Sequence, residues 1–266
     1  MIKALNLIFT NAKELGIRLS GFIILILFWE TAVRIGWLNP FYTSQPTGIY
    51  SDLIDFYESG LLWRHTSVTL KATLWGLFFG SVSGIIVAFI LGFSQTLAKV
   101  FEPLITGLYG IPKLALAPIF VLWFGLGIES KIIMSGLLVF FLVFFSTYGG
   151  IQDVDRNIVR SIRLMGATPF QIKYKVYLPA TAPWILAGIK GGLGASLIGA
   201  IVGEYMGASA GLGWMISYST SFFQVERVMS CIFILFLIGI IFNGILKIFE
   251  RVLLRWRAPA DFDQPL

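Results

Sequence analysis

The chain alternates between long apolar blocks and shorter polar stretches. Several apolar blocks approach or exceed the ~18–20 residues that an α-helix needs to cross a bilayer. Six blocks are expected to span a membrane, at about residues 19–35, 72–93, 104–124, 132–148, 184–205 and 229–249. Charged residues make up 13% of the chain and collect between these blocks, whereas 57% of the residues are apolar. The pattern predicts an all-α, polytopic membrane protein with six transmembrane helices.

A polar passage at residues 155–179 separates the fourth and fifth blocks and predicts two short helices joined at a glycine. Asp155 can cap the start of the first helix, and Gly166 stands where the left-handed residue that ends a helix is wanted. Such firm caps favour a built surface, although anchoring a plain loop can also demand them. Five basic residues give the passage a positive face: Arg156, Arg160, Arg163, Lys173 and Lys175.

The second short helix of this passage has its own start and stop signals. Thr168 and Gln171 form the pattern of a capping box, in which each side chain bonds to the other residue's backbone amide. Pro169 fills the first helical position, where its missing N–H costs nothing. Pro179 is expected to end the helix, because it cannot donate an amide and because it restricts the backbone of Leu178.

Two apolar blocks carry small residues at four-residue intervals. Small residues at that spacing let the backbone of another helix approach closely, so they predict packing seams within or between subunits. The glycines expected on these seams are Gly76, Gly80, Gly84, Gly188 and Gly192.

Three charged residues lie within apolar blocks and are candidates for a solute path: Lys113, Lys190 and Glu204. Prolines on both sides of Lys113 free backbone carbonyls, which a membrane helix tolerates only where they are buried in protein or line a cavity. Lys113 is therefore expected either on the solute path or against a partner helix. Lys190 and Glu204 are about 20 Å apart on one helix and cannot pair with each other.

Other isolated polar residues receive structural interpretations. His65, the single histidine, is expected on an exposed segment, and Lys131 in an outer turn. Glu30 and Arg34 are expected to form an ion pair one helical turn apart. Cys231 lies in an apolar block, so a single chain offers neither a disulfide nor a cysteine metal site, and no metal is expected. No cleaved signal peptide is expected at the N-terminus.

The distribution of positive charge predicts the orientation of the chain, whose net charge is +6. Basic residues concentrate on the side that holds both termini and the 155–179 passage, and such excess marks the cytoplasmic face. Residues 1–18 are expected to be a cytoplasmic segment, residues 19–250 the transmembrane domain, and residues 251–266 a cytoplasmic tail. A basic stripe of Lys247, Arg251 and Arg255 can rest on anionic lipid headgroups.

Nucleotide-binding and hydrolase motifs are absent from the sequence. It contains no phosphate-binding G-x-x-x-x-G-K-[ST], no G-x-S-x-G and no H-E-x-x-H. The glycines fall on apolar helices and not after strands, which argues against a dinucleotide site. The chain therefore carries no visible energy source of its own.

The 155–179 passage resembles a known motif. Gly166, nine further residues and then Val176-Tyr177-Leu178-Pro179 are similar to the G-x9-[IV]-x-L-P core of the EAA loop, which marks the membrane subunits of binding-protein-dependent ABC importers. Arg160 stands where that family has a glutamate. Three further segments, IPKLALAPIFVLWFGLGIESKI, LPATAPWILAGIKGGLGAS and GEYMGASAGLGWMI, resemble permeases of the nitrate, sulfonate, taurine and bicarbonate branch.

The resemblance implies a type I importer fold and a permease subunit that is not itself an enzyme. It implies a second permease copy, most simply a homodimer, two ATPase subunits and an external solute-binding protein, all at a bacterial or archaeal inner membrane. This chain would bind no cofactor, because ATP and magnesium act in the ATPase. The residues that the resemblance assigns to ATPase coupling are Arg163, Gly166, Ala167, Thr168, Pro169, Gln171, Leu178 and Pro179.

The resemblance implies a small solute, with an anion such as a sulfonate, taurine or nitrate favoured and heterocyclic vitamin precursors carried by related permeases. Lys113 and Lys190 agree weakly with an anion. The alternative from another class is an ion-coupled secondary transporter or channel, for which Glu204 is the one candidate intramembrane acid. A DNA-binding role for the basic passage is excluded by the membrane spans that bracket it.

Overall fold

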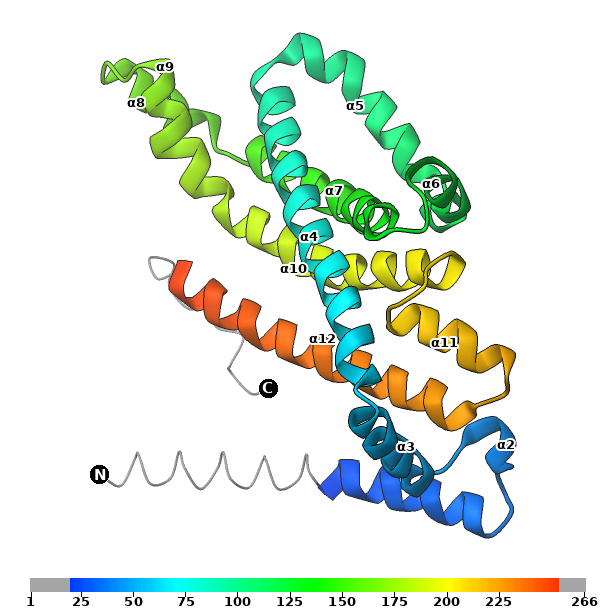
Figure 1. Cartoon of the computed structure of the whole chain (residues 1–266). Coiled ribbons are helices and arrows are strands. Elements are labelled where there is room, and N and C mark those ends of the chain that lie inside the picture. Colours follow the sequence, from blue (N-terminus) through cyan, green and yellow to red (C-terminus); the bar gives the residue numbers. More distant parts are fainter. Residues whose placement is uncertain (1–19, 254–266) are drawn as a thin grey trace, which may run out of the picture. The chain divides into compact units, whose positions relative to one another are not determined.

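The computed structural model describes residues 20–253, which are helical and, over that range, contain no strand (Figure 1). The expected cytoplasmic segment at residues 1–18, the beginning of the first apolar block and the tail beyond residue 253, with Arg255, lie outside the described residues. The chain divides into two compact units. Over the described range, the first unit contains residues 20–63 and 215–233, and the second contains residues 64–214 and 234–253.

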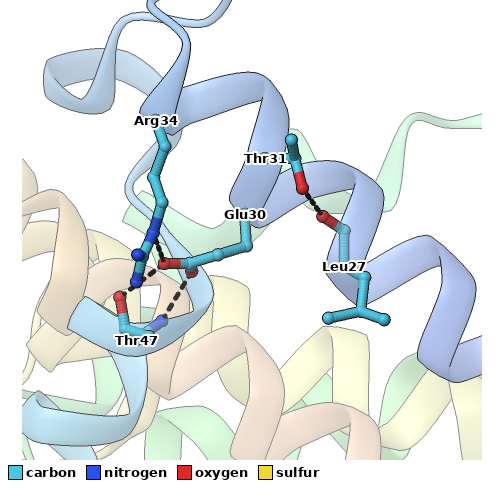
Figure 2. A network of polar contacts seen from close by, with 5 residues as sticks. All are labelled: Leu27, Glu30, Thr31, Arg34 and Thr47. Atoms are coloured by element: carbon cyan, nitrogen blue, oxygen red, sulfur yellow. Dashed lines mark hydrogen bonds and ion pairs between the residues drawn. The ribbon is translucent and has the colours of Figure 1, made fainter.

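The first unit begins with a helix described over residues 20–34, followed by α2 (Pro40–Thr43) and α3 (Pro46–Glu58). Glu30 ties two of these helices together (Figure 2). Its carboxylate accepts a 2.7 Å bond from Arg34 Nε, a 3.1 Å bond from the backbone N–H of Thr47 and a 3.0 Å bond from the Thr47 hydroxyl. The expected pair with Arg34 is confirmed, and the same carboxylate also satisfies a free amide in the first turn of α3.

A second ion pair in this unit joins α3 to α12 (Val225–Leu253). Arg227 Nε lies 2.9 and 3.0 Å from the two carboxylate oxygens of Asp52. The guanidinium carbon lies 4.2 Å from the ring centroid of Phe56, a fully buried side chain. The charge pair is thus partly enclosed, which strengthens it relative to an exposed pair.

The second unit contains most of the long helices. In chain order these are α4 (Leu61–Phe93), α5 (Gln95–Gly110), η1 (Lys113–Leu116), α6 (Ala117–Phe124), α7 (Ile128–Gln152), α8 (Arg156–Leu164), α9 (Pro169–Ile172), η2 (Lys173–Tyr177) and α10 (Leu178–Met206). Helices α4, α11 (Leu212–Ser221) and α12 each run from one unit into the other.

Helix α7 lies between α4 and α10, and glycine makes both contacts close. A Cβ atom built on Gly84 of α4 would lie 2.9 Å from the carbonyl oxygen of Phe140, and one on Gly188 of α10 would lie 3.0 Å from Val143 Cα. Gly76, Gly80 and Gly192 of the predicted seams also face α7. Because helix pairs in lipid gain nothing from apolar transfer, contact at backbone distance is what holds them.

Four helices are long and apolar enough to cross a membrane: Leu61–Phe93, Ile128–Gln152, Pro169–Met206 and Val225–Leu253. The bent pair Gln95–Gly110 and Lys113–Phe124 makes a fifth if it counts as one broken span. The sixth expected span, at about residues 19–35, begins outside the described residues. The transmembrane, all-α fold is confirmed, while the count of six is not reached within residues 20–253.

Two predicted boundaries are wrong. The stretch between the second and third expected spans is helical from Gln95, because the Ser94 hydroxyl accepts a 3.4 Å bond from Leu97 N–H and starts α5 at once. The outer turn expected at residues 124–131 shortens to Gly125–Gly127, since α7 begins at Ile128. Both errors come from polar residues that form helix ends instead of loops.

We predict that Gly84→Ala lowers the thermal stability of the purified protein, because the new methyl group must push apart the backbones of α4 and α7. Overpacking of this kind costs about 1–3 kcal/mol. The matched control is Gly194→Ala on α10, where a Cβ atom would meet nothing within 4 Å. Melting in detergent should move down for the first variant only, and equal melting temperatures would contradict the seam.

Candidate functional site

Helix α8 has a capped start and a sharply defined end. The Asp155 carboxylate accepts a 2.8 Å bond from Asn157 N–H. At the other end Gly166 has φ = +87°, and Gly166 N–H and Ala167 N–H donate to the carbonyls of Arg163 and Ile162. A left-handed residue at this position lets the turn close on its own carbonyls. Both predicted ends of the helix are confirmed.

The next turn, α9, begins with the predicted capping box. Gln171 N–H donates to the Thr168 hydroxyl at 3.3 Å, and Thr168 N–H donates to the Gln171 side-chain oxygen at 2.8 Å. Pro169 occupies the first turn of the helix. Only a short turn therefore separates α8 from α9, and the amides of Gly166, Ala167, Thr168 and Gln171 are all bonded.

The prediction that Pro179 ends the second helix is wrong. The chain passes from α9 through the π-helical segment η2 into α10 without a break, so residues 169–206 form one continuous helix. In η2 the N–H of Leu178 donates to the carbonyl of Lys173, five residues back. This wider turn accommodates the proline ring, and such π-segments recur at functional sites. Leu178 and Pro179 thus begin the membrane helix instead of closing a separate one.

The tip between α8 and α9 exposes apolar side chains that the sequence interpretation did not single out. Leu164, Met165 and Phe170 are 89%, 85% and 76% exposed, far more than a polar loop would leave uncovered without a partner. Tyr174 is also exposed, and its ring stacks parallel to that of Phe170 at 6.4 Å. We call these four residues the apolar tip. The signal in the sequence that could have indicated these residues was their position beside the end of α8 and the start of α9.

Lys113 lies at the break between α5 and α6, where the two helices bend by 85°. Its ammonium donates to the carbonyl of Tyr109 at 2.5 Å and lies 4.1 Å from that residue's ring centroid and 4.8 Å from that of Phe141. The carbonyl of Tyr109 would otherwise lack a partner, because Pro112 and Lys113 interrupt the helix. Lys113 therefore caps the broken helix and contacts α7.

Lys190 is exposed on α10 and lies 3.4 Å from Glu250 of α12. Both side chains are about half exposed, so this ion pair is weak. It does not bring Lys190 near Lys113 or Glu204.

Glu204 is fully buried and holds the start of α11. One carboxylate oxygen accepts 2.8 Å and 2.9 Å bonds from Gly213 N–H and the Thr69 hydroxyl. Thr69 Oγ1 in turn accepts from Leu212 N–H at 2.8 Å, and His65 Nδ1 accepts from Gly211 N–H at 3.1 Å. Three amides at the start of α11 are thus satisfied by three side chains. The expectation of an exposed histidine is wrong, since His65 is buried and stacks on Trp214.

Lys131, beside Glu204, binds backbone carbonyls, whereas Glu204 binds a backbone amide. Lys131 is buried, although an outer turn was expected, and its ammonium donates to the carbonyls of Leu126 and Gly207 and to the Ser130 hydroxyl. Gly207 follows the last residue of α10. A cation therefore closes the end of α10 and an anion opens α11, as the partial charges of helix ends favour.

Comparison with known proteins identifies the relatives of this chain. Residues 80–255 match the family model described as the binding-protein-dependent transport system inner membrane component. The formylaminopyrimidine transport permease protein of Halalkalibacterium halodurans is 36% identical over 89% of this chain and 94% of its own length. The aliphatic sulfonates transport permease protein of Bacillus subtilis is 32% identical, over 88% and 85%.

The fold has a solved counterpart. A chain of the MetNI methionine ABC transporter in an inward-facing conformation superposes with a TM-score of 0.64, covering 73% of this chain and 96% of its own, at 21% identity.

We predict that Glu204→Ala loosens α11, because the amide of Gly213 and the hydroxyl of Thr69 lose their buried acceptor. Leaving such groups unsatisfied costs about 1–3 kcal/mol. Hydrogen exchange at residues 212–216 should accelerate severalfold in this variant, and less in Glu204→Gln, which keeps an acceptor. Removal of an exposed acid, Glu226→Ala, is the control. Unchanged exchange in Glu204→Ala would refute the capping role.

Proposed function

Because this chain belongs to the family of binding-protein-dependent transport system inner membrane components, we propose that it forms half of the membrane pore of an ABC importer, as one of two identical permease copies. Two ATPase subunits bind its inner face, and an external binding protein delivers the solute. The chain is a transport component and binds no cofactor, while ATP and magnesium act in the ATPase. Both termini lie in the cytoplasm.

The apolar tip is the observation that carries this proposal. Four exposed apolar side chains lie at the turn between two capped helices, in a passage that is otherwise basic. Such a protruding apolar knob fits a hydrophobic groove on a partner, in the manner of helix-in-groove recognition. We assign the tip to the ATPase. The coupling residues expected from sequence support this surface: Arg163, Gly166, Ala167, Thr168, Pro169, Gln171, Leu178 and Pro179.

Movement of the ATPase reaches the membrane through α10. Since residues 169–206 form one helix, a displacement of the tip is a displacement of a membrane span. That span packs on α7 through Gly188 and Gly192, and its far end holds α11 through Glu204. The inner coupling surface and the outer helix are therefore linked by covalent and packed contacts within this chain.

For the solute we propose a small anion such as a sulfonate, taurine or nitrate. The sulfonate relative supports this class. The Glu204 carboxylate is already bonded to a hydroxyl and an amide. We therefore assign Glu204 a structural role beside the solute path and not a contact with the solute.

A formylaminopyrimidine is the second candidate solute, favoured by the 36% identity to a permease named for that compound. Competition between labelled taurine and formylaminopyrimidine for uptake, in cells expressing the whole transporter, separates the two. Uptake of the pyrimidine alone would overturn the anion assignment.

We predict that Phe170→Ala weakens binding of the ATPase subunit roughly tenfold, as loss of an aromatic anchor from an interface does. The measurement is titration of the purified ATPase onto the permease in nanodiscs. Tyr57→Ala is the matched control, because Tyr57 is 74% exposed, like Phe170, but belongs to the first unit. Equal affinity for both variants would remove the tip from the interface.

A further inference from the structure

An arginine-lined cavity of about 670 Å³ lies in the second unit where α8 meets the ends of α4 and α7. Its size falls in the ~300–1,000 Å³ range of small-molecule sites. The coupling passage contributes one wall and the membrane helices the other. The apolar tip, formed by Leu164, Met165, Phe170 and Tyr174, does not line this cavity.

The basic wall comes from a single face of α8. Arg156, Arg160 and Arg163 all line the cavity and are spaced so that they share one side of the helix. Over residues 20–253, none of the three guanidinium groups forms an ion pair with a carboxylate. Like charges at this spacing repel each other, and a bound anion relieves that repulsion. The free guanidinium forks match the geometry of phosphate oxygens.

The opposite wall belongs to the membrane helices and is mixed, with Gln95, Gln152 and Tyr148 beside apolar side chains. Leu91 and Gly92 lie in the last turn of α4, Ala98 lies in the first turn of α5, and Ile151 lies in the last turn of α7. Leu91 and Ile151 are buried in the same cluster as Phe144 and Tyr148. The cavity therefore presents charge on one side and a mixture of amide, phenol and alkyl groups on the other, at the ends of α4 and α7, which are long and apolar enough to cross a membrane.

We propose that this cavity binds the headgroup of an anionic phospholipid, with its phosphate on Arg156 and Arg160 and its glycerol oxygens toward Gln95 and Gln152. Basic pockets between membrane helices on the cytoplasmic side recognise such headgroups. Tyr148 and Tyr177 also line the cavity, and tyrosine is enriched at the depth of lipid headgroups. The proposal goes beyond the transport function and shares with it only the placement of α8 on the inner face.

An acidic segment of the ATPase is the competing occupant. The position of the cavity argues for lipid, because it lies at the ends of α4 and α7, which are long and apolar enough to cross a membrane. Bound lipid would also brace α8 against α4 and α7 when the tip is pushed.

The test is native mass spectrometry of the assembled transporter, permease with ATPase, titrated with phosphatidylglycerol or phosphatidylcholine. The wild type should retain phosphatidylglycerol, and the Arg156→Ala/Arg160→Ala pair should lose at least fivefold of it, with phosphatidylcholine unchanged. Arg64→Ala/Lys71→Ala removes the same charge from exposed residues of α4 that do not line the cavity and is the control. Equal loss of phosphatidylglycerol in both double variants would overturn the proposal.

Two further outcomes keep the test decisive. If the arginine pair loses its ATPase while phosphatidylglycerol binding stays unchanged, the occupant is the ATPase and the lipid site does not exist. If the alanine pair does not fold, Arg156→Lys/Arg160→Lys keeps both charges but loses the paired donors, and it should bind phosphatidylglycerol more weakly than the wild type. Wild-type binding by the lysine pair would contradict recognition by the guanidinium forks.

Discussion

Backbone hydrogen bonding governs this structure more than any single side-chain contact. In lipid, an amide or carbonyl released from a helix has no water to turn to, so every interruption needs a partner inside the protein. The described chain meets this demand with charged side chains. Lys113 takes the carbonyl freed at the break after α5, Lys131 takes the carbonyl at the end of α10, and Glu204 takes an amide at the start of α11. These three charged side chains cap helix ends.

The same demand explains the coupling passage. Pro179 has no backbone N–H to donate, and the chain forms the wider turn of Lys173–Tyr177 before it instead of a break. The result is a single helix from the exposed tip to Met206. A freely jointed loop at this place would absorb displacement, whereas a continuous helix packed on α7 carries it. The tight turn at Gly166 serves the same end, because it holds the tip in one geometry.

Helix caps and ion pairs that depend on residues within one helical turn were predictable from the sequence. The Asp155 cap, the left-handed Gly166 and the capping box of Thr168 and Gln171 each depend on residues within one turn, and each appears as expected. The ion pair of Glu30 and Arg34 is of the same kind. Family membership was also predictable, because the spacing from Gly166 to Pro179 is itself local.

The other expectations were wrong because they depended on tertiary structure. Proline at 179 is a stop signal in a simple helix, and only the π-helical turn before it removes the clash. His65 and Lys131 are polar residues near span ends, where exposure is the ordinary expectation. Their burial depends on α11 and on Gly207, which lie far away in sequence. The exposure of Phe170 could not be predicted either, because an apolar residue in a helical pattern is normally assigned to a core.

We propose that the unbroken helix from Pro169 to Met206 carries ATPase movement across the membrane. The most direct test compares two double variants. Lys175→Gly/Val176→Gly softens the helix beyond the tip, at about 1 kcal/mol per glycine. Lys175→Ala/Val176→Ala is the control. Spin labels at Ser209, in a background without Cys231, report the distance between the two permease copies with and without ATP. The account predicts that ATP changes this distance in the alanine pair and not in the glycine pair, while both retain their ATPase. An ATP-dependent change of equal size in the glycine pair would contradict it.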